Sequence, residues 1–158
     1  MNLLVSLFWL IVVLFFIILA FLAYKKGLYP KPIQGAINVV SFYPQLLLLK
    51  LKYQCGLKQE PWNWMDDTVL MGQMPIEQHV QKLSNMGVRY AVNLCYIYNI
   101  EQIYSKYGIE QLWLPTLDHY EPSLQDINSG VDLIQKARAE GAKVYVHCKG
   151  GHGRSAAG

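Results

Sequence analysis

The first 24 residues carry no charged side chain, and this feature constrains the chain more than any other. They read MNLLVSLFWLIVVLFFIILAFLAY, and Lys25 follows them. A helix of about 20 consecutive apolar residues is long enough to cross the hydrocarbon core of a bilayer. We therefore predict that residues 1–26 form a transmembrane anchor.

A cleaved secretory signal peptide is the alternative for this segment. Such a peptide has a basic start, an apolar run of about 7–15 residues and a small-x-small cleavage site. Here the start is uncharged, the run is longer, and the bulky Phe21 stands where a small residue is needed for cleavage after Ala23. These features favour an uncleaved anchor.

Basic residues follow the apolar run, and only the amino terminus precedes it as a positive charge. Lys25, Lys26 and Lys31 are the first of them. The positive-inside rule then predicts a single-pass protein whose body lies on the cytoplasmic side of the membrane. A mitochondrial presequence would be Arg-rich and amphipathic, which this segment is not. The mitochondrial and the endoplasmic reticulum membranes are both compatible with the prediction.

The charge and the cysteines limit the partners. A net charge of +3 suits an anionic substrate or a membrane surface. It is too small for a nucleic-acid-binding protein, so we expect no nucleic acid partner. Cys55, Cys95 and Cys148 form no CxxC pair and no zinc-type spacing with histidine. We expect no disulfide framework, no metal and no cofactor, and a lone reactive thiol is the natural alternative.

Residues 27–61 are predicted to be a linker that contains a second apolar segment. This segment, INVVSFYPQLLLLKLKY, is interrupted by Pro44, so we do not expect it to be a second span. We predict that it lies along the membrane interface, with Lys50 and Lys52 reaching lipid phosphates. Burial against the domain is the alternative.

From Trp62 onward, the pattern is typical of an α/β domain. Strands are predicted at residues 66–72, 88–94, 110–115 and 143–148, where apolar side chains alternate or run together. One helix follows the first strand, with a core face of Ile76, Val80 and Leu83 and an end at Gly87. This alternation of strands and helices predicts a largely parallel central sheet flanked by helices.

A second helix is predicted to begin at Ser123, with Asp126 three residues later as a capping signal. Its predicted core face consists of Leu124, Ile127, Val131 and Ile134, and the helix ends at Gly141.

The last predicted strand, KVYVHC, leads into the loop KGGHGRS and the start of a helix. Proteins of the α/β class place anion sites at such junctions, because free amides at a helix N-terminus point into the loop. Gly150, Gly151 and Gly153 supply unusual backbone angles and room for close approach. The loop is therefore predicted to form a nest of amides around a phosphate.

Three side chains give this loop a chemistry. Cys148 lies at its base, where the amides and Arg154 favour a negative charge, so we predict a depressed pKa and a thiolate at neutral pH. Arg154 can fork onto two phosphoryl oxygens. Ser155 can hydrogen-bond the sulfur and help it leave. The kinase-type pattern GxxxxGK[ST] is absent.

The segment VHCKGGHGRSAAG resembles the HCxxGxxRS signature of the cysteine-dependent protein tyrosine and dual-specificity phosphatases. The likeness extends through DDTVLMGQMPI, GVRYAVNLC and LPTLDHYEPS, from about Trp62 to Gly158. Within that superfamily the chain is most similar to the mitochondrial-type phosphatases that dephosphorylate phosphatidylglycerophosphate. They share the apolar lead-in FYPQLLL and the His-Cys-Lys start of the loop. The resemblance implies a dual-specificity-phosphatase-like fold.

The resemblance also implies a general acid in the loop after LPTLD. Asp118 is the matching position, and Glu121 is the rival carboxylate. His147 is expected to be structural, with a hydrogen bond behind the thiolate that tunes it. Lys149 and His152 line the loop; they either favour a doubly charged or lipid phosphate or are simply solvated.

The aromatic and remaining sulfur side chains are given structural roles. Trp62 and Trp64 are expected in the core or at an interface. Cys55 and Cys95 have no catalytic context and are expected to be packing residues.

These assignments predict a membrane-anchored phosphatase that hydrolyses phosphomonoesters of proteins (on tyrosine, serine or threonine) or of lipids through a cysteinyl-phosphate. Residues 62–158 would be its phosphatase domain, truncated after the phosphate-binding loop, because family members continue with further helices. The alternative is a catalytically inactive truncated fragment that acts at most as a phosphate-binding membrane protein.

Overall fold

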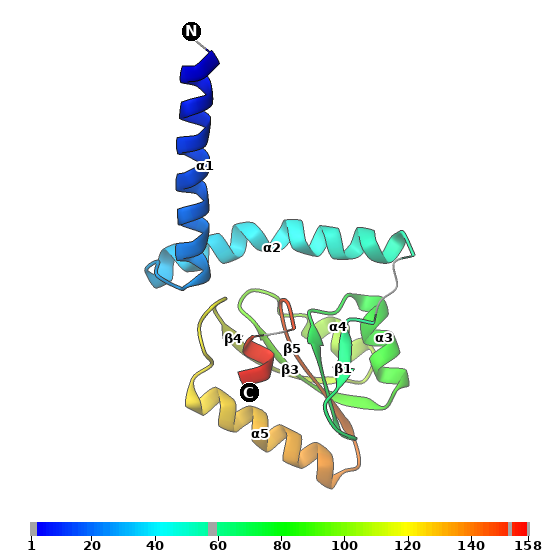
Figure 1. Ribbon diagram of the computed structural model, residues 1–158. Helices are drawn as coiled ribbons and strands as arrows, with labels where there is room; N and C mark the ends of the chain where they lie inside the picture. Colours follow the sequence, from blue (N-terminus) through cyan, green and yellow to red (C-terminus); the bar gives the residue numbers. More distant parts are fainter. Residues whose placement is uncertain (1–2, 57–59, 152, 158) are drawn as a thin grey trace.

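The computed structural model describes residues 3–56, 60–151 and 153–157. Two long helices, α1 (Leu3–Lys25) and α2 (Lys31–Gln54), precede an α/β domain. Figure 1 shows α1 projecting away from the domain, while α2 runs across it at a steep angle to α1. Within the described residues, α1 is the one helix that is long and apolar enough to cross a membrane.

Helix α2 runs without a break through Pro44, where the sequence predicted an interruption. Pro44 lies on the exposed side of the helix, next to the exposed Val40 whose carbonyl loses its intrahelical donor. The opposite side of the helix is held by Phe42, which packs against Met74 and Cys95. Tertiary packing therefore outweighs the local effect of the proline.

The two sides of α2 differ in character. The inner side buries Gln34, Gly35, Asn38 and Phe42. The outer side exposes a row of large apolar residues: Ile33, Val39, Val40, Tyr43, Leu47, Leu48 and Leu51. A row of this kind is typical of a helix that lies against an apolar medium.

The central sheet has five strands in the order β1-β2-β5-β3-β4. The strands are β1 (Trp62–Trp64), β2 (Val69–Gln73), β3 (Val88–Cys95), β4 (Glu110–Thr116) and β5 (Lys143–Cys148). Only the β1–β2 pairing is antiparallel among these. The mostly parallel sheet predicted from the sequence is confirmed, and its centre is β5, which ends at Cys148.

Helices cover both faces of the sheet (Figure 1). They are α3 (Glu77–Asn85), α4 (Glu101–Lys106), α5 (Leu124–Ala139) and the short α6 (Arg154–Ala157). The predicted cap of α5 is confirmed, since the Ser123 side chain accepts a hydrogen bond from the Asp126 amide at 3.1 Å. Strand β1 and helix α4 are additions to the elements that the sequence predicted.

The predicted core face of α5 is confirmed in part, because Ile127 and Ile134 are half-buried and Ile134 packs against the core. The fully or nearly fully buried positions are Gly130 and Ala137, whereas Leu124 is 74% exposed and Val131 is also exposed. Helix and sheet approach most closely along the two small residues, and Leu124 and Val131 lie off that line.

Candidate active site

The alternation of side chains along β5 decides what faces the phosphate-binding loop. Val144, Val146 and Cys148 belong to the core cluster on the α5 side of the sheet. Tyr145 belongs to the cluster on the other side, together with residues of α3 and α4. Cys148 thus ends the strand on the face where α6 begins, and its side chain is buried.

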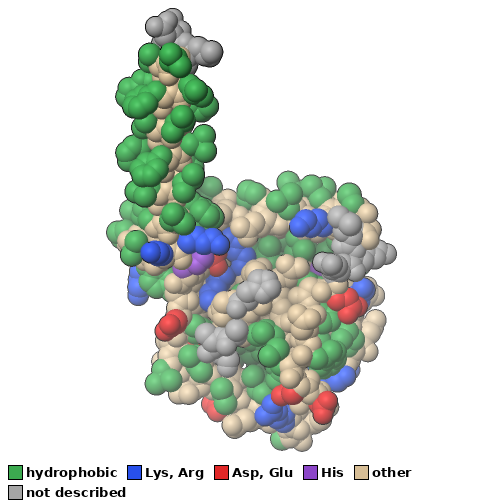
Figure 2. Space-filling model, viewed as in Figure 1, with side chains coloured by type: hydrophobic (Ala, Val, Ile, Leu, Met, Phe, Trp, Pro, Cys, Tyr) green, Lys and Arg blue, Asp and Glu red, His purple; other side chains and the backbone are tan. Residues whose placement is uncertain are grey.

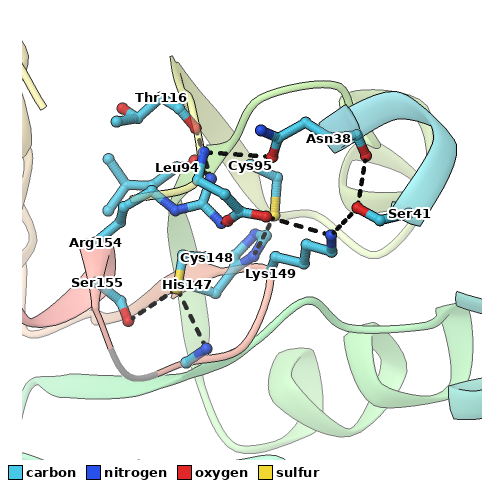
Figure 3. Close-up of polar contacts among 12 residues, drawn as sticks. Asn38, Ser41, Leu94, Cys95, Thr116, His147, Cys148, Lys149, Arg154 and Ser155 are labelled. Atoms are coloured by element: carbon cyan, nitrogen blue, oxygen red, sulfur yellow. Dashed lines mark hydrogen bonds and ion pairs between the residues drawn. The ribbon is translucent and has the colours of Figure 1, made fainter. Parts of the chain in front are cut away.

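The sulfur of Cys148 is surrounded by hydrogen-bond donors (Figure 3). The Gly151 amide donates to Sγ at 3.2 Å, and the Ser155 hydroxyl lies 3.4 Å from it. Burial by itself would raise the pKa of Cys148. The hydrogen bonds from Ser155 and Gly151 and the charge of Arg154 outweigh burial, so the pKa lies below its ordinary value, as the sequence predicted.

Gly151 is the glycine of the loop that the packing requires. Its φ is +77°, and a Cβ there would lie 2.7 Å from the Gly72 carbonyl carbon and 2.7 Å from the Gln73 amide nitrogen. At Gly150 and Gly153, in contrast, a Cβ would meet nothing within 4 Å. The close contact between the loop and the end of β2 therefore depends on one glycine.

Arg154 is buried at the first position of α6. Its Nη1 donates to the carbonyls of Leu94 at 3.2 Å and Thr116 at 2.5 Å, which lie near the ends of β3 and β4. Its Nη2 forms an ion pair with Asp118. The sheet thus holds one side of the planar Arg154 guanidinium, and the positive charge of this group lies beside the loop.

Asp118 is the carboxylate that the structure brings to the site. Besides Arg154, it pairs with Lys149 at 3.2 Å. Lys149 also donates to Ser41 of α2 at 3.0 Å, and its side chain is 9% exposed, so it is not a solvated lysine. Glu121, the rival candidate for the general acid, is exposed and lies on the rim of the pocket described below.

His147 is buried with its ring on the opposite face of the sheet from the Cys148 sulfur, so its hydrogen bond reaches the Cys148 backbone and not the sulfur. Its Nδ1 is 3.8 Å from Cys95 Sγ, and its ring stacks on Tyr145 with the centroids 5.3 Å apart. Burial lowers the pKa of His147 to about 3, against the effect of a hydrogen bond to the Cys148 backbone. Adjacent residues of a strand point to opposite faces, so the sequence already contained this signal.

The other predicted residues divide as follows. Cys95 is buried, as expected of a packing residue. Cys55 is exposed just after α2, so the packing role predicted for it is wrong. Trp62 is buried, whereas Trp64 is 46% exposed. His152 lies outside the described residues.

A pocket of about 960 Å³ opens above Cys148, and one of its walls was not predicted from the sequence. The loop contributes Cys148, Lys149 and Arg154, and the segment after β4 contributes Asp118. The remaining wall comes from the end of α1 and from α2: Ala20, Phe21, Tyr24, Lys25, Ile37, Ser41 and Gln45. The apolar amino-terminal helix therefore borders the same space as the thiol.

Residues 70–157 match the protein family described as dual specificity phosphatase, catalytic domain. This match covers more than half of the chain, and the chain belongs to that family. The resemblance found in the loop and the fold expected from it are thereby confirmed.

Curated relatives point to one branch of the family. The chain is 35% identical over 125 residues to the phosphatidylglycerophosphate phosphatase PTPMT2 of Arabidopsis thaliana, which covers 77% of this chain and 55% of that protein. It is 31% identical over 136 residues to the human phosphatidylglycerophosphatase and protein-tyrosine phosphatase 1, covering 78% and 67%. The chain thus spans between about half and two thirds of the length of these relatives.

Solved structures agree with this placement. The crystal structure of PTPMT1 superposes with a TM-score of 0.56 at 35% identity, over 60% of this chain and 66% of that one. A complex of PTPMT1 with PI(5)P gives a TM-score of 0.56 at 33% identity, over 61% and 67% of the two chains.

Proposed function

We propose that this chain is a membrane-anchored phosphatase that removes a monoester phosphate from a lipid through a cysteinyl-phosphate. The observation that carries the proposal is the shared pocket. A thiol of lowered pKa, a buried arginine and a carboxylate line it together with the end of an apolar helix. Membership of the dual-specificity phosphatase family supports the chemistry.

In the first step, the Cys148 thiolate attacks phosphorus and the bond between phosphorus and the ester oxygen breaks. Asp118, in its protonated form, gives its proton to the departing oxygen. Arg154 and the loop amides, including that of Gly151, stabilise the charge on the other three phosphoryl oxygens. The incoming phosphate competes with Asp118 for Arg154, which frees the carboxyl group to face the leaving group.

In the second step, a water molecule attacks phosphorus and the bond between phosphorus and sulfur breaks. Asp118 now acts as the base that takes the proton from this water. The Ser155 hydroxyl, 3.4 Å from Cys148 Sγ, donates to the thiolate as it leaves. Inorganic phosphate is released and the thiolate is regenerated.

The position of the pocket supports a lipid substrate. Figure 2 shows Lys and Arg side chains gathered at the foot of the apolar column formed by α1, with a histidine among them. Lys25, Lys149 and Arg154 line the pocket at this level. If α1 spans the bilayer and the exposed apolar side of α2 lies on its surface, the pocket opens at the headgroup level. A lipid could then stay in its leaflet while its phosphate reaches Cys148.

The basic residues at the end of α1 support a single-pass topology. Lys25 and Lys26 follow the span, which favours a domain on the cytoplasmic side of the membrane. Two relatives named as phosphatidylglycerophosphate-type phosphatases, and a related structure with PI(5)P, favour a phosphoglyceride as the substrate. A phosphotyrosyl protein is the second candidate, because the human relative is also named a protein-tyrosine phosphatase.

A phosphatase assay of the full chain in nanodiscs separates these candidates. The protein, reconstituted in nanodiscs, is given phosphatidylglycerophosphate, PI(5)P or a phosphotyrosyl peptide at equal phosphate concentration, and phosphate release is measured. We expect the lipids to be hydrolysed at least about tenfold faster than the peptide, a difference that corresponds to about 1.4 kcal/mol. A preference for the peptide would overturn the lipid assignment. Equal activity of wild type and Cys148→Ser would overturn the cysteine mechanism.

A further inference from the structure

Two buried amide side chains lie one turn apart on the inner side of α2. Gln34 and Asn38 are 0% and 4% exposed, and Asn38 Nδ2 donates to the Gln34 carbonyl at 2.8 Å. An amide side chain buried in this way costs free energy unless it is hydrogen-bonded, whereas leucine would fill a similar space without that requirement. What these two side chains bind is therefore informative.

Both side chains bind the backbone of Asp118, which lies 84 positions from Gln34 and 80 positions from Asn38 in the sequence. Gln34 Nε2 donates to the Asp118 carbonyl at 3.2 Å, and the Asp118 amide donates to Asn38 Oδ1 at 3.3 Å. The peptide groups on either side of the carboxylate are thus held by one helix. This arrangement fixes the point from which the Asp118 side chain leaves the backbone.

The next two residues are held by the end of α1 and by the turn that follows it. His119 has a φ of +65°, which is uncommon for a residue other than glycine. Its ring packs edge-on against Tyr24, with the centroids 5.0 Å apart. The Tyr120 hydroxyl is within donating distance of two carbonyls, that of Gly27 at 3.3 Å and that of Tyr29 at 3.2 Å. The contacts on both sides hold the unfavourable backbone conformation of His119 in place.

We propose that Gln34 and Asn38 are positioning residues for the general acid, so that the segment joining the anchor to the domain is part of the catalytic machinery. This inference rests on the proposed role of Asp118. It goes beyond that role because it assigns the geometry of the acid to α2. Proton donation requires a heavy-atom distance of about 2.6–3.2 Å to the leaving oxygen, so a small displacement of the loop is enough to impair it.

The dependence of rate on the leaving group tests this assignment. Asn38→Leu removes the acceptor for the Asp118 amide at similar volume. In nanodiscs, we expect its kcat on an alkyl phosphate such as phosphatidylglycerophosphate to fall about 10–100-fold, part of the 10²–10⁴-fold that general acids contribute. The kcat on p-nitrophenyl phosphate, whose leaving group needs little protonation, should change much less. Gln34→Leu should give the same pattern with a smaller loss.

Two further variants complete the experiment. Gln54→Leu, at the exposed end of α2, is the matched control and should leave both rates unchanged. Asp118→Asn should show the strongest leaving-group selectivity of the series. If Asp118→Asn is selective and Asn38→Leu is not, the positioning role is overturned while the acid stands. If Asp118→Asn loses both activities equally, the proposed acid itself is wrong.

A purely structural role for Asn38 would give equal losses on both substrates, and this outcome would also overturn the proposal. Where Asn38→Leu does not fold, Tyr120→Phe provides the second route, since it removes one hydroxyl from the same loop and keeps the ring. We expect a selective loss of about threefold to tenfold on the alkyl phosphate, or about 0.7–1.4 kcal/mol. Unchanged selectivity in Tyr120→Phe and in Gln34→Leu would contradict the inference.

Discussion

Cys148 and Cys95 are both buried at the ends of two neighbouring parallel strands, β5 and β3. The pKa values of their thiols nevertheless shift in opposite directions from the ordinary value. The pKa of Cys148 is lowered although burial opposes this. The pKa of Cys95 is raised well above its usual range by burial, and the charge of Arg154 only partly counteracts it. A place at the carboxyl edge of a parallel sheet is therefore not enough to make a thiol reactive.

The difference lies in the donors around each sulfur. Cys148 Sγ is contacted by the Gly151 amide and the Ser155 hydroxyl. Cys95 Sγ faces the ring of His147, which burial keeps neutral, and its side chain packs with Phe42 and Met74. The loop after β5 supplies what the end of β3 lacks, so the two cysteines provide an internal comparison of a nucleophile and a packing residue.

The largest expected effect is on turnover. Cys148→Ser replaces the thiolate by a hydroxyl that stays protonated at neutral pH, and we expect kcat on any phosphomonoester to fall at least about 10³-fold. Cys95→Ala should retain most of the turnover and lose about 1 kcal/mol of stability through a small cavity. Initial rates and thermal denaturation of both variants, in the same nanodiscs, check this. Full turnover in Cys148→Ser would show that Cys148 is not the nucleophile.

Selective alkylation is the next largest effect. In a Cys55→Ser background, which removes the exposed third thiol, iodoacetamide at pH 6.5 should modify Cys148 at least about tenfold faster than Cys95, because the thiolate is the reactive form. Peptide mass mapping over time gives the two rates. Equal rates would mean that burial, and not the donor set, controls both sulfurs.

Much of this contrast could be read from the sequence. The loop signature, the mostly parallel sheet and the cap at Ser123 depend on short-range patterns, and they agree with the structure. The alternation of β5 could also have placed His147 on the far face. The continuous α2 could not be predicted, because Phe42 packs with residues from distant segments and outweighs Pro44.

The part of the site contributed by α1 and α2 also escaped prediction. The hydrogen bonds that Gln34 and Asn38 share with the Asp118 backbone join positions 84 and 80 residues apart, and no periodicity marks such a pair. Similarly, the exposure of the Leu124 side chain depends on which residues of α5 pack against the sheet. Local patterns predict elements and motifs, whereas tertiary contacts decide which elements share a pocket.

A smaller effect is expected from Ser155→Ala. The hydroxyl helps to keep the pKa of Cys148 below its ordinary value, so its removal should raise that pKa. The thiolate form exists above the pKa, and the midpoint of the alkylation rate against pH should therefore move to higher pH. The phosphocysteine should also accumulate, and a burst of product would precede the steady state. An unchanged midpoint would show that Gly151 and Arg154 are sufficient.

The smallest expected change concerns stability on the Cys95 side. Burial lowers the pKa of His147 to about 3, whereas in the unfolded chain it lies near 6.5. Between these values the unfolded state binds the proton that the folded state excludes, so stability is greatest above about pH 6.5 and declines as the pH falls toward 3. The slope from one such group is at most about 1.4 kcal/mol per pH unit.

His147→Phe, which keeps a ring against Tyr145, should flatten this slope, measured from thermal midpoints between pH 6.5 and 4 in nanodiscs. The slope should not vanish, because burial also lowers the pKa of His79 to about 4, with a smaller contribution from Lys82, and His79 remains in the variant. His79→Phe in addition should reduce the slope further, and His119, whose pKa burial also lowers, contributes to the remainder. A slope equal to that of the wild type in His147→Phe would show that the imidazole behind Cys95 is protonated in the fold, and the neutral environment assigned to Cys95 would then be wrong.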